Sequence, residues 1–161
     1  MALREIVQFG NDILRKKCRP VTAFDEKLGS LLDDMVETLH TKEGVGLAAP
    51  QVGILRRAVV IDLRDKKARE KDNKGVVELI NPEILETSGV QEGNEGCLSA
   101  PGEWCEVERP AHVVVKAQDR NGNEFTITGE GLMARALCHE IDHLDGILFT
   151  DRVQKTIAKR D

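Results

Sequence analysis

The segment from Gly131 to Leu144, GLMARALCHEIDHL, constrains the fold most, because it predicts a helix with two different faces. Helix-forming residues fill it, and Gly146 follows as a candidate C-cap. At 100° per residue, the apolar side chains that form one stripe are Met133, Leu137, Ile141 and Leu144. His139 and His143 share a separate face with Leu132 and Ala136. Such a helix must pack against a core on one side and carry polar chemistry on the other.

The two histidines have the spacing of a metal site. His139 and His143 are four residues apart, and Glu140 directly follows the first. This is the H-E-x-x-H pattern of zinc hydrolases, in which the glutamate acts as general base without ligating the metal. Cys138 points about 120° away from the histidine face, so it is rejected as the third ligand.

The third protein ligand of the metal must come from a segment upstream of the helix. In H-E-x-x-H-x-x-G-x-x-H, the third histidine would fall at Phe149, and the thermolysin type needs a later glutamate that the chain lacks. The segments with suitable character are 44–51, which ends in a carboxamide, and 95–99, which contains Cys97.

Composition limits the class of protein. A chain of 161 residues suits one domain. A formal net charge of −5 argues against general nucleic-acid affinity. No stretch approaches the ~20 apolar residues of a membrane span, and no secretory signal is present. Four cysteines in such a chain are expected to be thiols or ligands in a reducing compartment, which predicts the cytoplasm.

The rest of the chain alternates between helix and strand patterns. Asp25 begins an amphipathic helix that runs to His40. A strand is expected around 57–63, an exposed charged loop at 64–75, and a strand at 76–85 that Pro82 interrupts. Asn121-Gly122 joins two strands as a hairpin. Helices near both ends and strands between them predict an α+β fold.

Three motifs carry a resemblance to a known family. GVGLAAPQ (44–51), EGCLS (95–99) and HEIDH (139–143) occur in this order and are similar to the signature motifs of peptide deformylase. The resemblance covers essentially the whole chain. It implies one catalytic domain over 1–161, with antiparallel sheets packed around the C-terminal HExxH helix and an N-terminal amphipathic helix.

The resemblance also assigns roles to residues. It makes Cys97, His139 and His143 the ligands of one divalent metal, with an open position for a water whose pKa the metal lowers to about 7. The water, as hydroxide, attacks the formyl carbonyl, Glu140 serves as general base and acid, and the Gln51 side chain and the Leu98 N–H are oxyanion donors. The expected substrate-binding residues are Gly44, Val45, Gly46, Leu132 and Ala136.

The implied reaction releases formate from the N-formylmethionine of nascent polypeptides. The family implies Fe²⁺ in the cell, with Zn²⁺, Ni²⁺ or Co²⁺ as substitutes, although zinc also suits the ligands. The ribosome near the exit tunnel is a second candidate partner. The C-terminus is shorter than in family members with a long terminal helix, which argues against docking on the ribosome through such a helix. Three residues depart from the family pattern: Arg135, which is expected to line a polar pocket rim or extend outward, and Trp104 and Cys105.

Two other functions stay open. The same metal site could hydrolyse a different amide, such as an N-acetyl group or a peptide bond. Alternatively, the ligands could hold a closed, structural metal. Glu140 and Gln51 argue against the second hypothesis, because a structural site needs neither a base nor an oxyanion donor.

Overall fold

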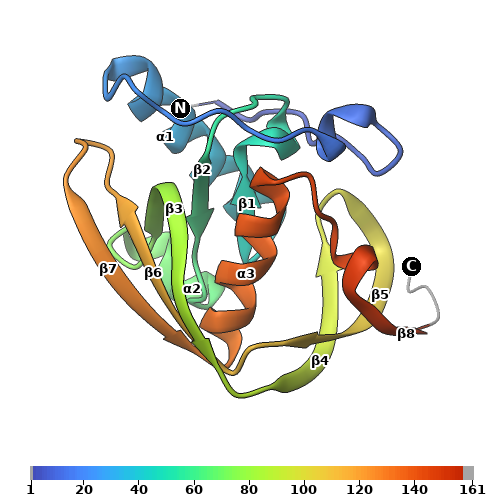
Figure 1. Ribbon diagram of the computed structural model, residues 1–161. Coiled ribbons are helices and arrows are strands. Elements are labelled where there is room, and N and C mark those ends of the chain that lie inside the picture. The colour runs from blue at the N-terminus through green and yellow to red at the C-terminus, as the bar shows by residue number, and fades with distance from the viewer. Residues whose placement is uncertain (1, 158–161) are drawn as a thin grey trace.

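The computed structural model describes residues 2–157, which form helices and antiparallel sheets (Figure 1). In chain order the elements are η1 (Asp12–Arg15), α1 (Glu26–Thr41), β1 (Gly46–Ala48), η2 (Ala49–Val52), β2 (Ala58–Ile61), α2 (Lys66–Lys71), β3 (Val77–Ser88), β4 (Gln91–Cys97), β5 (Ala100–Arg109), β6 (His112–Gln118), β7 (Glu124–Glu130), α3 (Leu132–Leu144), η3 (Phe149–Arg152) and β8 (Val153–Ile157). None of the described helices is long and apolar enough to cross a membrane.

The strands form two sheets with α3 between them. One sheet has the order β1-β2-β3-β6-β7 and the other the order β4-β5-β8. Every pairing within them is antiparallel. Figure 1 shows α3 at the centre, with the five-stranded sheet on one side and the β4–β5 pair on the other, and α3 contacts strands of both sheets. The helix therefore lies between the two sheets.

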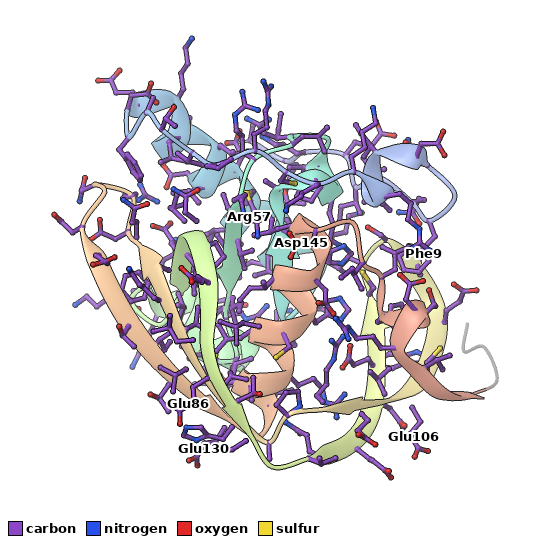
Figure 2. All side chains as sticks on the ribbon, in the orientation of Figure 1. Phe9, Arg57, Glu86, Glu106, Glu130 and Asp145 are labelled. Atoms are coloured by element: carbon purple, nitrogen blue, oxygen red, sulfur yellow. The ribbon has the colours of Figure 1, made fainter. Side chains whose placement is uncertain are left out.

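The apolar stripe of α3 lies in the main core. Leu137, Ile141 and Leu144 are buried there with strand residues such as Val59 and Val115. The helix ends as expected, because Gly146 adopts a φ of +73°. Arg57, the residue before β2, donates to the Leu144 carbonyl at 3.0 Å and pairs with Asp145 at 2.9 Å (Figure 2). A cation at this end also complements the helix dipole.

The helix α1 begins where the sequence predicts. The Asp25 side chain accepts a hydrogen bond from the Leu28 N–H at 3.1 Å, which makes it the N-cap. The buried side chains of this helix recur at three- and four-residue steps: Leu28, Leu31, Leu32, Met35, Val36 and Leu39. They form a second core with β1 and β2.

Two local predictions are wrong. The segment 64–75 is not entirely loop, because α2 forms there, with the Asp65 side chain accepting from the Ala68 N–H at 2.9 Å. The strand around Pro82 is not interrupted but continues as β3, with a register shift at the proline. Asn81, at a φ of +51°, donates to the Val21 carbonyl at 2.9 Å and accepts from the Val21 N–H at 2.8 Å. These side-chain bonds hold the strand in place where its regular pairing shifts.

The hairpin at Asn121-Gly122 is confirmed. Strands β6 and β7 pair from His112–Glu130 to Gln118–Glu124 without a register shift. Gly122 has a φ of +85°, which glycine adopts without steric cost.

Candidate metal centre and active site

The end of β4 meets the polar face of α3. Cys97 is the last residue of β4, and its Sγ lies 3.4 Å from Nε2 of His143. Candidate ligand atoms of Cys97, His139 and His143 all lie within 4.8 Å of one another. A tight turn through Leu98 and Ser99 returns the chain to β5, where Ala100 pairs with Cys97. This turn brings the distant cysteine to the histidine pair.

Glu95 orients one imidazole. It precedes Cys97 by two residues on the same strand, with a register shift between the two. Its Oε1 accepts from His139 Nδ1 at 2.7 Å. Because an ionised carboxylate only accepts, Nδ1 carries the proton and Nε2 is left to bind a metal.

Glu95 is held ionised by its cationic neighbours. Arg109 donates to both of its oxygens at 2.8 Å, and Arg135 donates to Oε2 at 2.5 Å. Burial opposes the charge, but the bonds from Arg109 and His139 outweigh it and lower the pKa of Glu95 to about 2. Arg109 also pairs with Asp142 of α3 at 2.7 Å, which ties β5 to the metal-site helix.

His143 is almost completely buried beside His139. Burial and the neighbouring His139 lower its pKa well below the usual value, so its imidazole is neutral, which is the form that ligates metals. Its Nδ1 has no hydrogen-bond partner among the described residues. Phe149 occupies the place of the third histidine in the extended H-E-x-x-H-x-x-G-x-x-H motif. Its ring stacks on the His139 ring at a centroid distance of 5.8 Å.

Glu140 lies beside the candidate ligands. Its Oε2 is 4.0 Å from Nε2 of His139, and within the described chain its Oε1 has no partner. Burial is the main cause that raises the pKa of Glu140 to about 7. A Cβ on Gly46 would lie 2.6 Å from Glu140 Oε2, so the absence of a side chain at 46 leaves room for the carboxylate.

Gln51 reaches the centre from η2. Its Oε1 accepts from the Ala48 N–H at 2.9 Å, which fixes the amide orientation. Its Nε2 donates to Ser99 Oγ at 3.1 Å and lies 3.3 Å from Cys97 Sγ. The carboxamide is thus a fixed N–H donor next to the cysteine.

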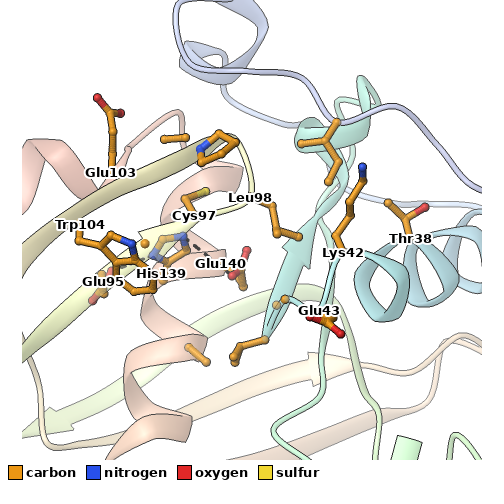
Figure 3. A pocket seen from close by; sticks show the side chains of 18 of the residues that line it. Thr38, Lys42, Glu43, Glu95, Cys97, Leu98, Glu103, Trp104, His139 and Glu140 are labelled. Atoms are coloured by element: carbon orange, nitrogen blue, oxygen red, sulfur yellow. Dashed lines mark hydrogen bonds and ion pairs between the residues drawn. The ribbon is translucent and has the colours of Figure 1, made fainter. Parts of the chain in front are cut away.

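A cleft of about 910 Å³ opens onto the centre (Figure 3). The predicted residues that line it are Gly44, Val45, Gly46, Cys97, Leu98, Leu132, Ala136, His139 and Glu140. Gln51 and His143 are not among the lining residues but are buried behind it. Trp104 also lines the cleft, where its ring lies against Gly96.

Arg135 is among the residues that line the cleft, as a polar rim requires, but its side chain is buried and does not extend outward. Its side chain points inward, where Nη1 bonds Glu95 and the Val107 carbonyl at 3.1 Å. Cys138 lies in the main core, in agreement with its rejection as a ligand. Cys105 is buried in another cluster, and burial raises its pKa. Sequence reasoning assigned no role to Glu95, although its place two residues before Cys97 was a usable signal.

Comparisons with known proteins agree with one another. A family model described as polypeptide deformylase matches residues 3–159. The peptide deformylase of Caldicellulosiruptor bescii is 55% identical over 100% of this chain and 92% of its own length. A crystal structure of a peptide deformylase from Legionella pneumophila has a TM-score of 0.88 at 46% identity and covers 95% of this chain and 87% of that one. The crystal structure of the peptide deformylase from Thermotoga maritima also has a TM-score of 0.88, at 42% identity, and the match covers 96% of this chain and 99% of that one.

Proposed function

Because the chain belongs to the polypeptide deformylase family, we propose that Cys97, His139 and His143 hold the metal with which it removes the N-formyl group from nascent polypeptides. The family is an enzyme family, and deformylation of nascent peptides is its activity. One observation carries the residue assignment: a cysteine from β4 and two histidines of α3 converge beside Glu140 in a cleft. The match over 3–159 supports the interpretation of 1–161 as one catalytic domain.

The residues at the centre fit a divalent metal. One thiolate and two imidazoles are suitable donors for zinc or iron, and they leave a position open. The Glu95 carboxylate on His139 supplies the outer hydrogen bond that metal-ligating histidines have. When bound, the ion acts as a Lewis acid and makes a water molecule a better nucleophile at neutral pH.

The surrounding side chains have separable roles. Glu140, buried next to His139, accepts the proton of the attacking water and returns it to the departing amine. Gln51 Nε2 and the Leu98 N–H stabilise the negative oxygen that develops on the formyl carbonyl. Losing one such donor typically costs about 10²–10³ in kcat.

The cleft walls receive the substrate. The segment 44–46 forms one wall, and no acceptor for the Val45 N–H is found within the described part of the chain. An extended peptide can therefore pair with this backbone. Leu132 and Ala136 on α3 offer apolar contacts near His139 for the methionine side chain.

Formate release tests this assignment. The wild-type enzyme is expected to release formate from formyl-Met-Ala-Ser and to leave acetyl-Met-Ala-Ser intact. Glu140→Ala should lose formate release while it retains one metal ion per chain. Equal hydrolysis of the acetyl peptide would support the broader amidase hypothesis, and full activity of Glu140→Ala would refute the role of the base.

We also propose Fe²⁺ as the metal in the cell, with Zn²⁺, Ni²⁺ or Co²⁺ as substitutes, on the basis of the family resemblance. Metal analysis of anaerobically purified protein tests this proposal, and stoichiometric zinc with no iron would contradict it. Because iron and a thiolate together are sensitive to oxygen, air should inactivate the enzyme through Cys97.

The origin of the substrate suggests where the enzyme works. Nascent formylated chains emerge in the cytoplasm, and we propose that the enzyme meets them near the ribosomal exit tunnel. Residues 158–161, on which such a contact could depend, lie outside the described part of the chain. Co-sedimentation with ribosomes at low and high salt tests the contact, and no co-sedimentation at low salt would contradict it.

A further inference from the structure

A buried carboxylate lies directly after β2, close to the cleft wall. The Asp62 side chain has no exposed surface. It pairs with Nε2 of His40 at 2.7 Å and with Nε of Arg64 at 2.9 Å. Its own N–H donates to the Val45 carbonyl at 2.8 Å, so this charge cluster is attached to the segment that lines the cleft.

Arg69 of α2 completes the cluster. Its Nη2 donates to the Gly44 carbonyl at 2.7 Å and to the Asp62 carbonyl at 2.5 Å. Its Nε donates to the Arg64 carbonyl at 3.0 Å and lies 3.6 Å from Asp62 Oδ2. Only 12% of the side chain is exposed, so these contacts are formed largely away from solvent. Hydrogen bonds from charged donors of this kind are the stronger ones in proteins.

The segment 44–46 needs such an anchor. Glu43, the residue before it, has a φ of +57°, which costs energy for a residue other than glycine. Gly44 itself is bonded to the end of α1 through its N–H, which donates to the Leu39 carbonyl at 3.0 Å. Its carbonyl is bonded by Arg69. Together with the bond from Asp62 to Val45, these contacts fix the backbone from behind while its other side lines the cleft.

We propose that Arg69 is a positioning residue for substrate binding, and this inference rests on the proposed function. By holding the Gly44 carbonyl against Asp62, it keeps the 44–46 backbone in the position from which it can pair with a formylated peptide. Arg69 touches neither the reacting atoms nor the candidate metal ligands. Its loss should therefore weaken peptide binding and leave the chemical step intact.

Steady-state kinetics of the metal-loaded enzyme test the proposal. Arg69→Ala should raise KM for formyl-Met-Ala-Ser about tenfold, equivalent to about 1.4 kcal/mol, with kcat within about twofold of wild type. Formyl-Met amide, which offers less backbone to pair, should show a much smaller change. Arg69→Lys retains the charge but cannot bond two carbonyls in the same geometry, so its KM for formyl-Met-Ala-Ser should lie between those of wild type and Arg69→Ala.

Lys67→Ala is the matched control, because it removes an exposed cation from the same helix. It should leave KM unchanged. A KM for Arg69→Ala equal to that of wild type would overturn the proposal. An equal rise for both substrates, or an equal effect of Lys67→Ala, would do the same.

Hydrogen exchange provides a readout that does not depend on activity. In Arg69→Ala, amides of residues 44–47 should exchange faster than in wild type, while those of α3 and β6 should be unchanged. Unchanged exchange at 44–47 would contradict the anchoring role. If the wild-type enzyme released no formate, the proposed function would fail, and the exchange result would still decide whether Arg69 anchors the segment.

Discussion

Replacing Gly46 by alanine should displace the Glu140 carboxylate and so lower activity, although Glu140 itself is unchanged. A Cβ at residue 46 would lie 2.6 Å from Glu140 Oε2 and 2.9 Å from both Cδ and Cγ, where ordinary contacts begin at about 3.4 Å. Because Cγ is also too close, the side chain cannot avoid the methyl group by rotating its carboxylate alone. Glu140 is buried, so it must move by nearly 1 Å within a packed site. A displacement of this size can cost about 10² in rate.

The assay is formate release from formyl-Met-Ala-Ser, with metal content and thermal unfolding measured on the same samples. For Gly46→Ala we expect kcat to fall about 100-fold with one metal ion per chain retained. Gly29→Ala is the matched control, because its Cβ would meet only Arg120 Nη1, at 3.7 Å. It lies in α1 and should keep full activity with slightly higher stability. A kcat for Gly46→Ala within about threefold of wild type would refute this account of Glu140.

Three further predictions follow from the contacts around the site and the fold. Glu95→Gln should weaken metal affinity about 10–100-fold in competition with a chelator, because the carboxylate that orients an imidazole is lost; unchanged affinity would contradict that role. Burial of Asp62 opposes its charge, but its hydrogen bonds outweigh this and lower its pKa, so the stability it contributes is present above about pH 4 and is lost as the pH falls further. Asp62→Asn should therefore lower the free energy of unfolding by about 3 kcal/mol at pH 7. In thermal unfolding, the difference in Tm between this variant and wild type should become smaller below about pH 4. Gly146→Ala adds a Cβ against the Arg15 backbone at a φ of +73° and should lower Tm by roughly 5–10 °C, whereas Gly10→Ala, at a φ of +98° with open space around it, should lower Tm less.

Periodicity predicted the elements that have a long, regular pattern. The stripe of α3, the N-cap Asp25 and the hairpin at Asn121-Gly122 depend on local rules, and the structure agrees with each of them. The helix α2 was missed because its residues are almost all charged. Its stability comes from the Asp65 cap and from Arg69, which makes contacts with residues distant in the sequence.

Long-range contacts also explain the other differences. Pro82 suggested the end of a strand, but Asn81 compensates through bonds to Val21, sixty residues away. Arg135 was expected to make the pocket rim polar or to extend outward, because it departs from the family pattern, and the structure excludes only the outward placement. It is buried because Glu95, forty residues earlier, accepts its hydrogen bond. No local pattern contains such partners.

The candidate ligands were found from the sequence because their spacing and motifs are local. His139 and His143 share one face of a helix, and the motif around Cys97 supplied the resemblance that joined it to them. The geometry that orients His139 was not predicted, since it needs the pairing of β4 with β5 to bring Arg109 to Glu95.

The central claim is that one sulfur and two imidazole nitrogens hold the metal. X-ray absorption spectroscopy of the anaerobically loaded enzyme tests it most directly. We expect one sulfur at about 2.3 Å and two nitrogens at about 2.0–2.1 Å if zinc is loaded, and loss of the sulfur shell in Cys97→Ser. A wild-type metal shell without sulfur, or one with a second protein sulfur, would contradict the account.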